Sequence, residues 1–330
     1  MSLLEVKNVS RSFGHLKAVH DVSFTLEAGT ILGFIGPNGA GKSTTMRIIA
    51  TLDVPTSGEV LLDGHSVIER PDRARPLIGY MPDRYGTYED MTVFEFLDFF
   101  ARAYKLQGKE REHRVASVMD FAGVTHLKDK LTSDMSKGMK QRVALSRTLL
   151  HDPKLLILDE PADGLDPRAR IELRELLKAL AAQGKAVLIS SHILTELSEI
   201  CDSCAIIEQG KLLATGAVHE VLARSSGEAA SADLWLRLFA PAEGLAEAMA
   251  KAERLLLEQP YVARVVVNGS ALEVKVQLAP GEAPTAHWVD GVSAQLIKVL
   301  VNQSIPVSAL QTRELDLEDA FMNVTKGRVQ

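Results

Sequence analysis

Residues Gly36–Thr44 read Gly-Pro-Asn-Gly-Ala-Gly-Lys-Ser-Thr and match the pattern G-x-x-x-x-G-K-[ST]. Glycines at these spacings let the backbone turn so that successive N–H groups face one anion. An apolar run, Thr30 to Ile35, enters the segment, and Thr44 to Thr51 has the character of a helix whose N-terminus faces phosphate. Lys42 adds a positive charge for the outer phosphates, and the Ser43 hydroxyl can ligate magnesium. The segment therefore predicts a site for a nucleoside triphosphate.

Composition limits what surrounds this site. A chain of 330 residues, 46% hydrophobic and 24% charged, can bury a sizeable core and has room for a large domain and a smaller one. The net charge of -6 gives no basic surface for nucleic acid. The sequence contains no uncharged apolar run near the roughly 18 residues that span a bilayer, and it does not begin like a signal peptide. We expect a cytosolic protein unless a partner holds it at a membrane.

Short apolar runs alternate with helical patterns in the first two thirds of the chain. Continuous apolar runs are typical of strands buried on both faces, and their alternation with helices favours a parallel-rich sheet covered by helices, an α/β fold. Between Met91 and Leu131 the pattern is helical only, which predicts a helical insert over about residues 84–150. A further helix is predicted over Arg168–Gln183. Strands are predicted at Leu3–Val6, Ile31–Ile35, Leu155–Leu158, Val187–Ser190 and Cys204–Ile207.

The composition changes at residues 225–233, which read Ser-Ser-Gly-Glu-Ala-Ala-Ser-Ala-Asp and are typical of a linker. The predicted domains are therefore 1–224 and 234–330. In the second, the expected order is strand, helix, two strands joined at Asn268-Gly269, helix and strand, which indicates a small α+β domain of the ferredoxin-like class. The elements are Leu234–Phe239, Ala242–Glu258, Ala263–Val267, Leu272–Leu278, His287–Asn302, Pro306–Gln311 and a closing helix Leu317–Thr325.

A second motif, Leu155 to Glu160, is an apolar run that ends in two acidic residues. A carboxylate at the tip of a buried strand beside a phosphate loop can hold magnesium, a role we assign to Asp159. The next carboxylate can orient and polarise an attacking water, a role we assign to Glu160. The alternative, a solvated acidic pair that merely ends a strand, loses weight beside a phosphate loop.

Two further features carry weaker signals. His192 ends the segment Val187-Leu188-Ile189-Ser190-Ser191-His192, where it can contact a γ-phosphate or serve as a structural histidine. Cys201 and Cys204 are spaced as C-x-x-C, but no further ligands cluster near them. We therefore interpret the cysteines as two small, partly buried thiols.

These motifs occur together in the order found in ATP-binding cassette (ABC) ATPases, which the first 222 residues resemble. The resemblance is carried by the phosphate loop, by the five residues Met135 to Met139 with the following Lys-Gln-Arg, by Leu158 to Pro161, by Gly164-Leu165-Asp166 and by His192. The Ser-Lys-Gly-Met variant of the signature resembles the exporter subclass with separately encoded permeases, which includes drug, polysaccharide and gliding-motility systems. Residues Leu317 to Phe321 resemble the tail of many of its members.

The resemblance implies roles for individual residues. The signature would begin a helix whose N-terminus reaches the γ-phosphate of a nucleotide held by a second cassette, so that ATP joins a homodimer and hydrolysis releases it. Asp166 would cross that interface, and His192 would act with Glu160 in catalysis. Phe13 would stack on adenine, although a core position is the alternative, and Val19 would line the base pocket. The implied nucleotide contacts are Phe13, Val19, Gly36, Pro37, Asn38, Gly39, Ala40, Gly41, Lys42, Ser43, Thr44, Ser136, Lys137, Gly138, Met139 and Asp166.

Asp83 departs from the family pattern, in which most cassettes carry glutamine at this position. An ionised aspartate accepts but does not donate hydrogen bonds and is one methylene shorter. It can still reach Mg²⁺, so the expected magnesium ligands are Ser43, Asp83 and Asp159. We expect slower or more tightly gated hydrolysis than in a glutamine-bearing relative. The aromatic segment Tyr85–Tyr104 follows, and the resemblance implies that it forms the groove for a coupling helix of the permease.

The leading hypothesis is an ATPase subunit that works on the cytoplasmic side of the membrane, with ATP and Mg²⁺ as cofactors, and drives export through a separate permease. The alternative is a soluble cassette ATPase acting on ribosomes or nucleic acid. Proteins of that class usually carry two cassettes or a long coiled-coil insertion, and this chain shows neither. Sugar importers append a barrel-like domain, which the strand and helix order after Asp233 does not fit.

Overall fold

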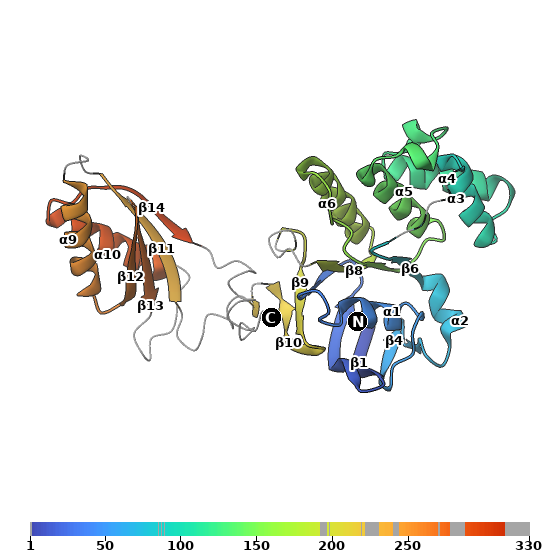
Figure 1. Ribbon diagram of the computed structural model, residues 1–330, viewed down its shortest axis with the longest axis horizontal. Helices are drawn as coiled ribbons and strands as arrows, with labels where there is room; N and C mark the ends of the chain where they lie inside the picture. The colour runs from blue at the N-terminus through green and yellow to red at the C-terminus, as the bar shows by residue number, and fades with distance from the viewer. Residues whose placement is uncertain are drawn as a thin grey trace. The chain divides into compact units, whose positions relative to one another are not determined.

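The computed structural model describes residues 2–84, 86, 88, 90–191, 197, 199–218, 220–221, 231–239, 244–269, 271–277 and 288–313. The chain divides into two compact units, Met1–Val218 and His219–Gln330 (Figure 1). Among the described residues, the first unit contains two sheets and the second unit one, and each unit has its own hydrophobic core.

A six-stranded sheet in the order β10-β9-β3-β8-β7-β6 organises the first unit. Five of its strands are parallel, and only β10 runs antiparallel to its neighbour β9. Parallel strands need crossover connections, and helices supply several of them here. The strands are β3 (Ile31–Ile35), β6 (Ile78–Met81), β7 (Leu155–Leu158), β8 (Ala186–Ser191), β9 (Ser203–Glu208) and β10 (Lys211–Ala217).

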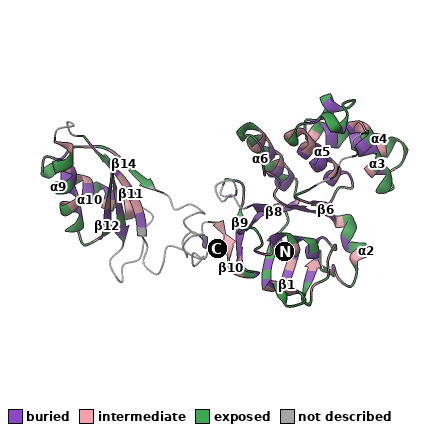
Figure 2. Ribbon diagram, viewed as in Figure 1, coloured by how far each residue is buried: buried purple, intermediate pink, exposed green. Residues whose placement is uncertain are grey.

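The predicted strands of this sheet match the structure closely. β3 and β7 have the predicted bounds, and β8 and β9 each extend one residue further at both ends. Every residue of β3, β7 and β8 is buried, which explains why their sequences are continuous apolar runs (Figure 2).

The sequence did not predict a second, antiparallel sheet with the order β2-β1-β4-β5. The predicted strand Leu3–Val6 is only the start of β1. Register shifts on both sides of Val9, together with the positive φ of 50° at Asn8, interrupt the alternation that would have revealed the longer strand. The strands are β1 (Ser2–Phe13), β2 (Leu16–Glu27), β4 (Ser57–Leu62) and β5 (His65–Ser66).

Helices flank the six-stranded sheet. In Figure 1, α5 and α6 lie on one side of β6 and β8, whereas α1 lies on the other side with β1 and β4. The core beneath α1 joins residues of both sheets, among them Phe24 and Phe34 with ring centroids 5.5 Å apart. The helices whose bounds are described in this unit are α1 (Lys42–Ile49), α2 (Pro71–Ala74), α3 (Val93–Ala103), α4 (Gly108–Phe121), α5 (Lys137–Leu149) and α6 (Pro167–Ala182).

The predicted helical insert contains α3, α4 and α5 together with short 3₁₀ turns at Thr125–Leu127 and Thr132–Asp134. Helix α3 begins with a capping box, in which Thr92 and Glu95 each bond the other's backbone N–H. Its aromatic residues divide between inside and outside. Phe96 is buried, whereas Phe99 remains 43% exposed.

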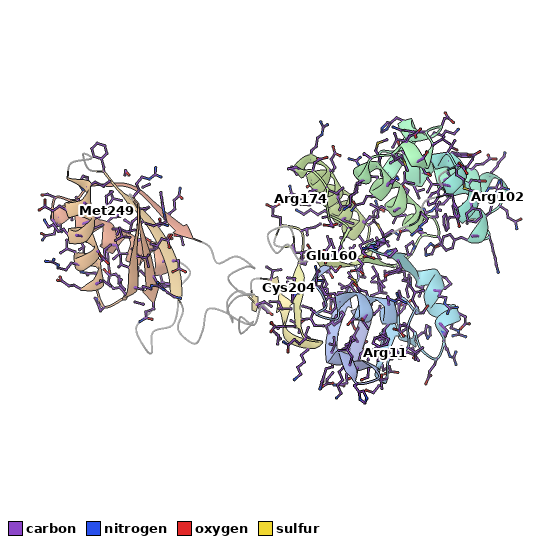
Figure 3. The ribbon with its side chains drawn as sticks, viewed as in Figure 1. Arg11, Arg102, Glu160, Arg174, Cys204 and Met249 are labelled. Atoms are coloured by element: carbon purple, nitrogen blue, oxygen red, sulfur yellow. The ribbon has the colours of Figure 1, made fainter. Side chains whose placement is uncertain are left out.

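Both cysteines are free thiols, as the sequence predicted. Cys204 lies on β9 (Figure 3). It is fully buried, and burial raises its pKa to about 11. Burial also raises the pKa of Cys201, whose sulfur would lie 2.9 Å from a Cβ placed on Gly33. The close approach to a glycine in β3 gives Cys201 a packing role.

The second unit follows the predicted order of strand, helix, two strands, helix and strand. Its four strands form an antiparallel sheet in the order β12-β13-β11-β14. Gly269, with φ +60°, lies at the predicted turn between β12 and β13. The elements are β11 (Ser231–Leu238), α9 (Leu245–Leu257), β12 (Val262–Asn268), β13 (Ala271–Gln277), α10 (Trp288–Asn302) and β14 (Val307–Arg313).

Alternate residues of the strands in this unit pack with α9 and α10. Leu234, Leu236 and Val274 from the sheet form one buried cluster with Met249 and Leu296 from the helices. β11 begins three residues earlier than predicted, because the small residues 231–233 were assigned to the linker. The closing helix predicted over Leu317–Thr325, with its family-like tail, lies outside the described residues, as do residues 225–230 of the predicted linker.

Candidate nucleotide-binding site

The segment Gly36–Thr44 connects β3 to α1, as the phosphate-loop pattern requires. A Cβ on Gly36 would lie 2.3 Å from the carbonyl oxygen of Ile207, so no side chain fits there. A Cβ on Gly41 would lie 2.5 Å from the carbonyl oxygen of Ala18, and Gly41 has φ +104°. Gly39 has open space around it but a φ of +80°, which also favours glycine. The loop therefore needs its glycines for both close approach and backbone conformation.

One side of the loop is held by backbone hydrogen bonds to the core, and the other side is exposed. Ala40 is buried, its N–H donates to the carbonyl of Pro37 at 3.2 Å, and its own carbonyl accepts from Gly210 at 2.9 Å. Pro37, Asn38, Gly39 and Ser43 are exposed, and Thr44 is half-buried. The first N–H groups of α1 have no acceptor within the helix and carry its positive dipole end. This end of the loop fits an anion.

Lys42 lies at the centre of the site and is only 5% exposed. Its Nζ donates to the carbonyl oxygen of Gly36 at 2.7 Å and lies 3.2 Å from Oε1 of Glu160. Two motifs more than a hundred residues apart in the sequence therefore meet through one ammonium group. A bound phosphate would compete for the same ammonium.

Asp159 follows β7 and is 2% exposed. Its Oδ1 accepts a 2.6 Å hydrogen bond from the hydroxyl of Ser190 on the neighbouring strand β8. The same hydroxyl oxygen accepts the backbone N–H of Glu160 at 2.8 Å. Ser190 thus fixes both acidic residues. No motif in the sequence marks Ser190, although its place near the end of a buried strand, two residues before His192, is a usable signal.

Glu160 has an unusual backbone conformation, with φ +49°. A left-handed conformation costs a non-glycine residue roughly 1–2 kcal/mol, so surrounding contacts must hold it. The hydrogen bond from its N–H to Ser190 and the ion pair with Lys42 supply such contacts. In Figure 3, Glu160 lies where the sheet meets the helices of the first unit.

Asp83 and Asp159 line one small cleft of about 20 Å³ with Glu160. Asp83 is exposed, and its Oδ1 accepts the backbone N–H of Arg84 at 2.7 Å. Mg²⁺ in phosphate sites is usually held by one or two carboxylates together with substrate phosphates, and this cleft offers oxygen donors of that kind. The residues present fit Mg²⁺. Tyr80 lies nearby on β6, where burial and the charge of Asp159 raise its pKa to about 12.

The signature residues form the N-terminus of α5. Ser136 is the N-cap, and its hydroxyl accepts the N–H of Met139 at 3.3 Å. Ser136 and Lys137 are exposed, whereas Gly138 and Met139 are half-buried. Asp166 is the N-cap of α6, where its Oδ1 accepts the N–H of Ala169 at 2.9 Å. Two capped helix ends therefore lie at the surface of the first unit.

The two candidate base contacts differ in exposure. Phe13 is 48% exposed, and the Arg11 guanidinium lies 4.5 Å above its ring, so the alternative core position for Phe13 is wrong. Val19 is fully buried in the core, and its side chain offers no surface to a base. The predicted contact of Val19 with adenine is therefore not supported. His192 lies outside the described residues.

Comparisons with known proteins agree with this geometry. A family model described as ABC transporter matches residues 19–163. The chain is 32% identical over 324 residues to the linearmycin resistance ATP-binding protein LnrL of Bacillus subtilis (strain 168), covering 98% of each chain. It is 39% identical over 224 residues to the Nod factor export ATP-binding protein I of Rhizobium meliloti (strain 1021), covering 68% of this chain and 67% of that protein.

Among solved structures, the first unit resembles a bacterial ABC transporter cassette determined as a dimer, MJ0796. The TM-score is 0.59 with 25% sequence identity, over 65% of this chain and 98% of the cassette. Within the part of the chain that the structure describes, none of the helices combines the length and the apolar character that a membrane crossing requires.

We predict that Ser190→Ala slows ATP hydrolysis by tenfold or more while ATP still binds. The change leaves Asp159 Oδ1 and the Glu160 N–H without their shared partner, and an unsatisfied buried polar group costs about 1–3 kcal/mol. Steady-state phosphate release and fluorescent-nucleotide binding measure the two effects. Ser191→Ala, the next residue on β8, is the matched control. Equal loss of turnover in both variants would contradict a specific role for Ser190.

Proposed function

The chain belongs to the ABC transporter family of ATP-binding subunits and hydrolyses ATP in support of transport, and on this premise we propose that it drives export through a separate membrane permease. Support comes from the two relatives, one named for linearmycin resistance and one for Nod factor export. The match to the first relative spans both units of the chain. The alternative role on ribosomes or nucleic acid is not favoured, since neither relative is named for such a role.

The contact among Lys42, Glu160, Asp159 and Ser190 is the observation that carries the catalytic proposal. The loop N–H groups and Lys42 bind the β- and γ-phosphates. When the γ-phosphate attracts the ammonium, Glu160 is released from its ion pair with Lys42 and can accept a proton from an attacking water. Ser190 keeps the Glu160 backbone in place throughout. We assign the γ-phosphate contact after β8 to His192, on the resemblance alone.

We assign Mg²⁺ to Ser43 and Asp159, with Asp83 as a third, outer ligand. When bound, the ion neutralises charge on the phosphates. The exposed hydroxyl of Ser43 lies in the first turn of α1, and the Asp159 carboxylate is oriented by Ser190. Phe13 is assigned to adenine stacking, because its exposed ring with an adjacent Arg11 offers a flat surface.

We propose that two copies of the chain close around ATP. The loop residues 37–39, Ser136 and Lys137 at the start of α5, and Asp166 are all exposed, as surfaces that meet a partner must be before closure. The N-terminus of α5 carries a partial positive charge suited to the γ-phosphate of the partner's nucleotide. The similarity to a cassette solved as a dimer supports this arrangement.

We place the permease contact on an aromatic patch formed by Tyr88 and Phe99, which are 50% and 43% exposed. Their ring centroids are 5.6 Å apart, and Phe99 packs at 5.2 Å on Phe100. Phe96 supports Tyr88 from the core. Exposed aromatic pairs beside a polar surface are typical of docking sites. The subunit would then work peripherally, on the cytoplasmic side of the membrane.

We further propose that residues 1–224 are the cassette, that 225–233 link it to the next domain and that 234–330 form an accessory domain of the ferredoxin-like class. The antiparallel sheet order β12-β13-β11-β14, with helices after β11 and β13, supports the class. We propose that this domain regulates the dimer or binds the partner.

Glu160→Gln should trap an ATP-bound dimer, because the amide keeps the size of the side chain but removes the base. Lys42→Ala should lose ATP binding instead. Light scattering with and without Mg-ATP reports the dimer, and phosphate release reports turnover, which we expect to fall by at least two orders of magnitude. Normal turnover of Glu160→Gln would assign the base to another residue.

Asp83→Gln should raise the rate of hydrolysis several-fold, because a glutamine amide donates a hydrogen bond that an ionised aspartate does not. The rate at saturating Mg-ATP is the measurement. Asp83→Asn, which donates but keeps the shorter side chain, separates the effect of donation from that of reach. An unchanged rate in both variants would remove this account of Asp83.

Phe99→Glu should weaken binding to the permease by at least tenfold while leaving ATP hydrolysis by the isolated subunit unchanged. The charge disrupts the exposed aromatic patch but lies outside the nucleotide site. Co-purification from membranes with the permease encoded nearby is the measurement. Leu52→Glu, at a 55% exposed position of the same unit, is the matched control. Undiminished co-purification of Phe99→Glu would place the contact elsewhere.

A further inference from the structure

Lys137 and Asp163 form an ion pair within one chain. Lys137 is the first residue of α5, and Asp163 belongs to the loop that leads from β7 to α6. The Lys137 Nζ donates to Asp163 Oδ2 at 2.9 Å, and the two side chains are 54% and 56% exposed. The pair connects the signature turn to the loop that carries Asp166.

The lysine side chain lies directly over Gly164. A Cβ on Gly164 would be 2.3 Å from Lys137 Nζ and 3.2 Å from its Cε. Gly164 also has φ +65°, which disfavours any other residue. The absence of a side chain at residue 164 therefore gives the lysine stem its path across the loop to Asp163.

Two further contacts join the same segments. A Cβ on Gly138 would meet Leu165 Cδ2 at 3.6 Å and Ala169 Cβ at 3.8 Å, so the first turn of α5 packs closely on the loop and on the start of α6. One turn along, Arg142 of α5 forms an ion pair with Glu172 of α6. Three contacts along the chain, at Lys137, Gly138 and Arg142, therefore connect the N-terminal part of α5 to the loop before α6 and to the start of α6.

The ammonium of Lys137 is directed toward its own chain. It lines the small cleft that also contains Gln141, Asp159 and Glu160, and its hydrogen-bond acceptor is Asp163. Gln141, one turn along α5, is 3% exposed in this cleft. The carboxylates of the cleft attract the lysine, so in this arrangement it does not extend away from the chain toward another molecule.

We propose that Lys137 is a positioning residue that fixes the Asp163–Asp166 loop to the first turn of α5, so that Ser136 and Asp166 meet the partner cassette as one body. This inference rests on the proposed ATP-dependent dimer. Closure covers the half-exposed pair, which reduces solvent screening and strengthens its attraction. An exposed pair of this kind changes an equilibrium by up to about fivefold, and the two pairs of a dimer together change it by up to about 25-fold. Because a dimer binds two ATP, the ATP concentration for half-maximal dimer changes by the square root of that factor, up to about fivefold.

The test uses the full chain carrying Glu160→Gln, with Lys137→Met, Asp163→Asn or both residues exchanged as Lys137→Asp and Asp163→Lys. Light scattering measures the Mg-ATP concentration that gives half-maximal dimer. A fluorescent ADP analogue measures nucleotide binding to the single chain. We expect each single variant to need about two- to fivefold more ATP, with ADP binding unchanged, and the exchanged pair to recover most of the loss. Lys178→Met, an exposed lysine on α6, is the matched control.

Three outcomes would overturn the inference. If Lys137→Met weakens dimerisation while Asp163→Asn strengthens it, the ammonium binds the partner's phosphate and Asp163 competes for it. If neither variant differs from Lys178→Met, the pair has no positioning role. If the parent Glu160→Gln chain itself forms no dimer with Mg-ATP, the proposed function fails and the inference fails with it. Thermal unfolding of each variant excludes simple loss of fold.

Discussion

The site depends on a constraint of sheet geometry. β3, β7 and β8 are adjacent, parallel and fully buried, so their carboxyl ends meet at one edge of the sheet. The phosphate loop follows β3, the two acidic residues follow β7, and Ser190 lies near the end of β8. Because β3 and β7 are apolar throughout and β8 is apolar up to Ser190, chemistry is confined to this edge, where parallel α/β sheets generally bind ligands.

The sequence motifs predicted which segments lie at this edge of the sheet, but they did not specify the contacts between those segments. The pattern around Lys42 and the acidic end of β7 predicted that these two motifs lie next to each other, since both motifs act on a bound phosphate. The ion pair of Lys42 with Glu160 and the double role of Ser190 depend on strand order and side-chain direction, which no local pattern encodes. The sequence predicted that Asp166 lies at a dimer interface. Its second role as the N-cap of α6 is evident only in the structure.

The same distinction holds for the fold. Elements buried on both faces were predicted almost to the residue, because an apolar run has clear ends. The antiparallel sheet of β1, β2, β4 and β5 was not predicted, because its strands are half-exposed and interrupted by register shifts. In the second unit, regular alternation in β11 and β13 and the turn at Gly269 made the order predictable. Periodicity predicts structure well only where burial is regular.

The phosphate loop has its own counterion. Lys42 contacts Glu160 and the Gly36 carbonyl, so the buried ammonium of the loop is paired with a carboxylate of the same chain. An incoming anion must outcompete a carboxylate that is held in place by the backbone. A small monovalent anion offers little more than that carboxylate does, whereas a triphosphate offers several charged oxygens to the lysine and to the loop at once. The ion pair between Lys42 and Glu160 therefore favours the binding of ligands with several negative charges, independently of how the base is recognised.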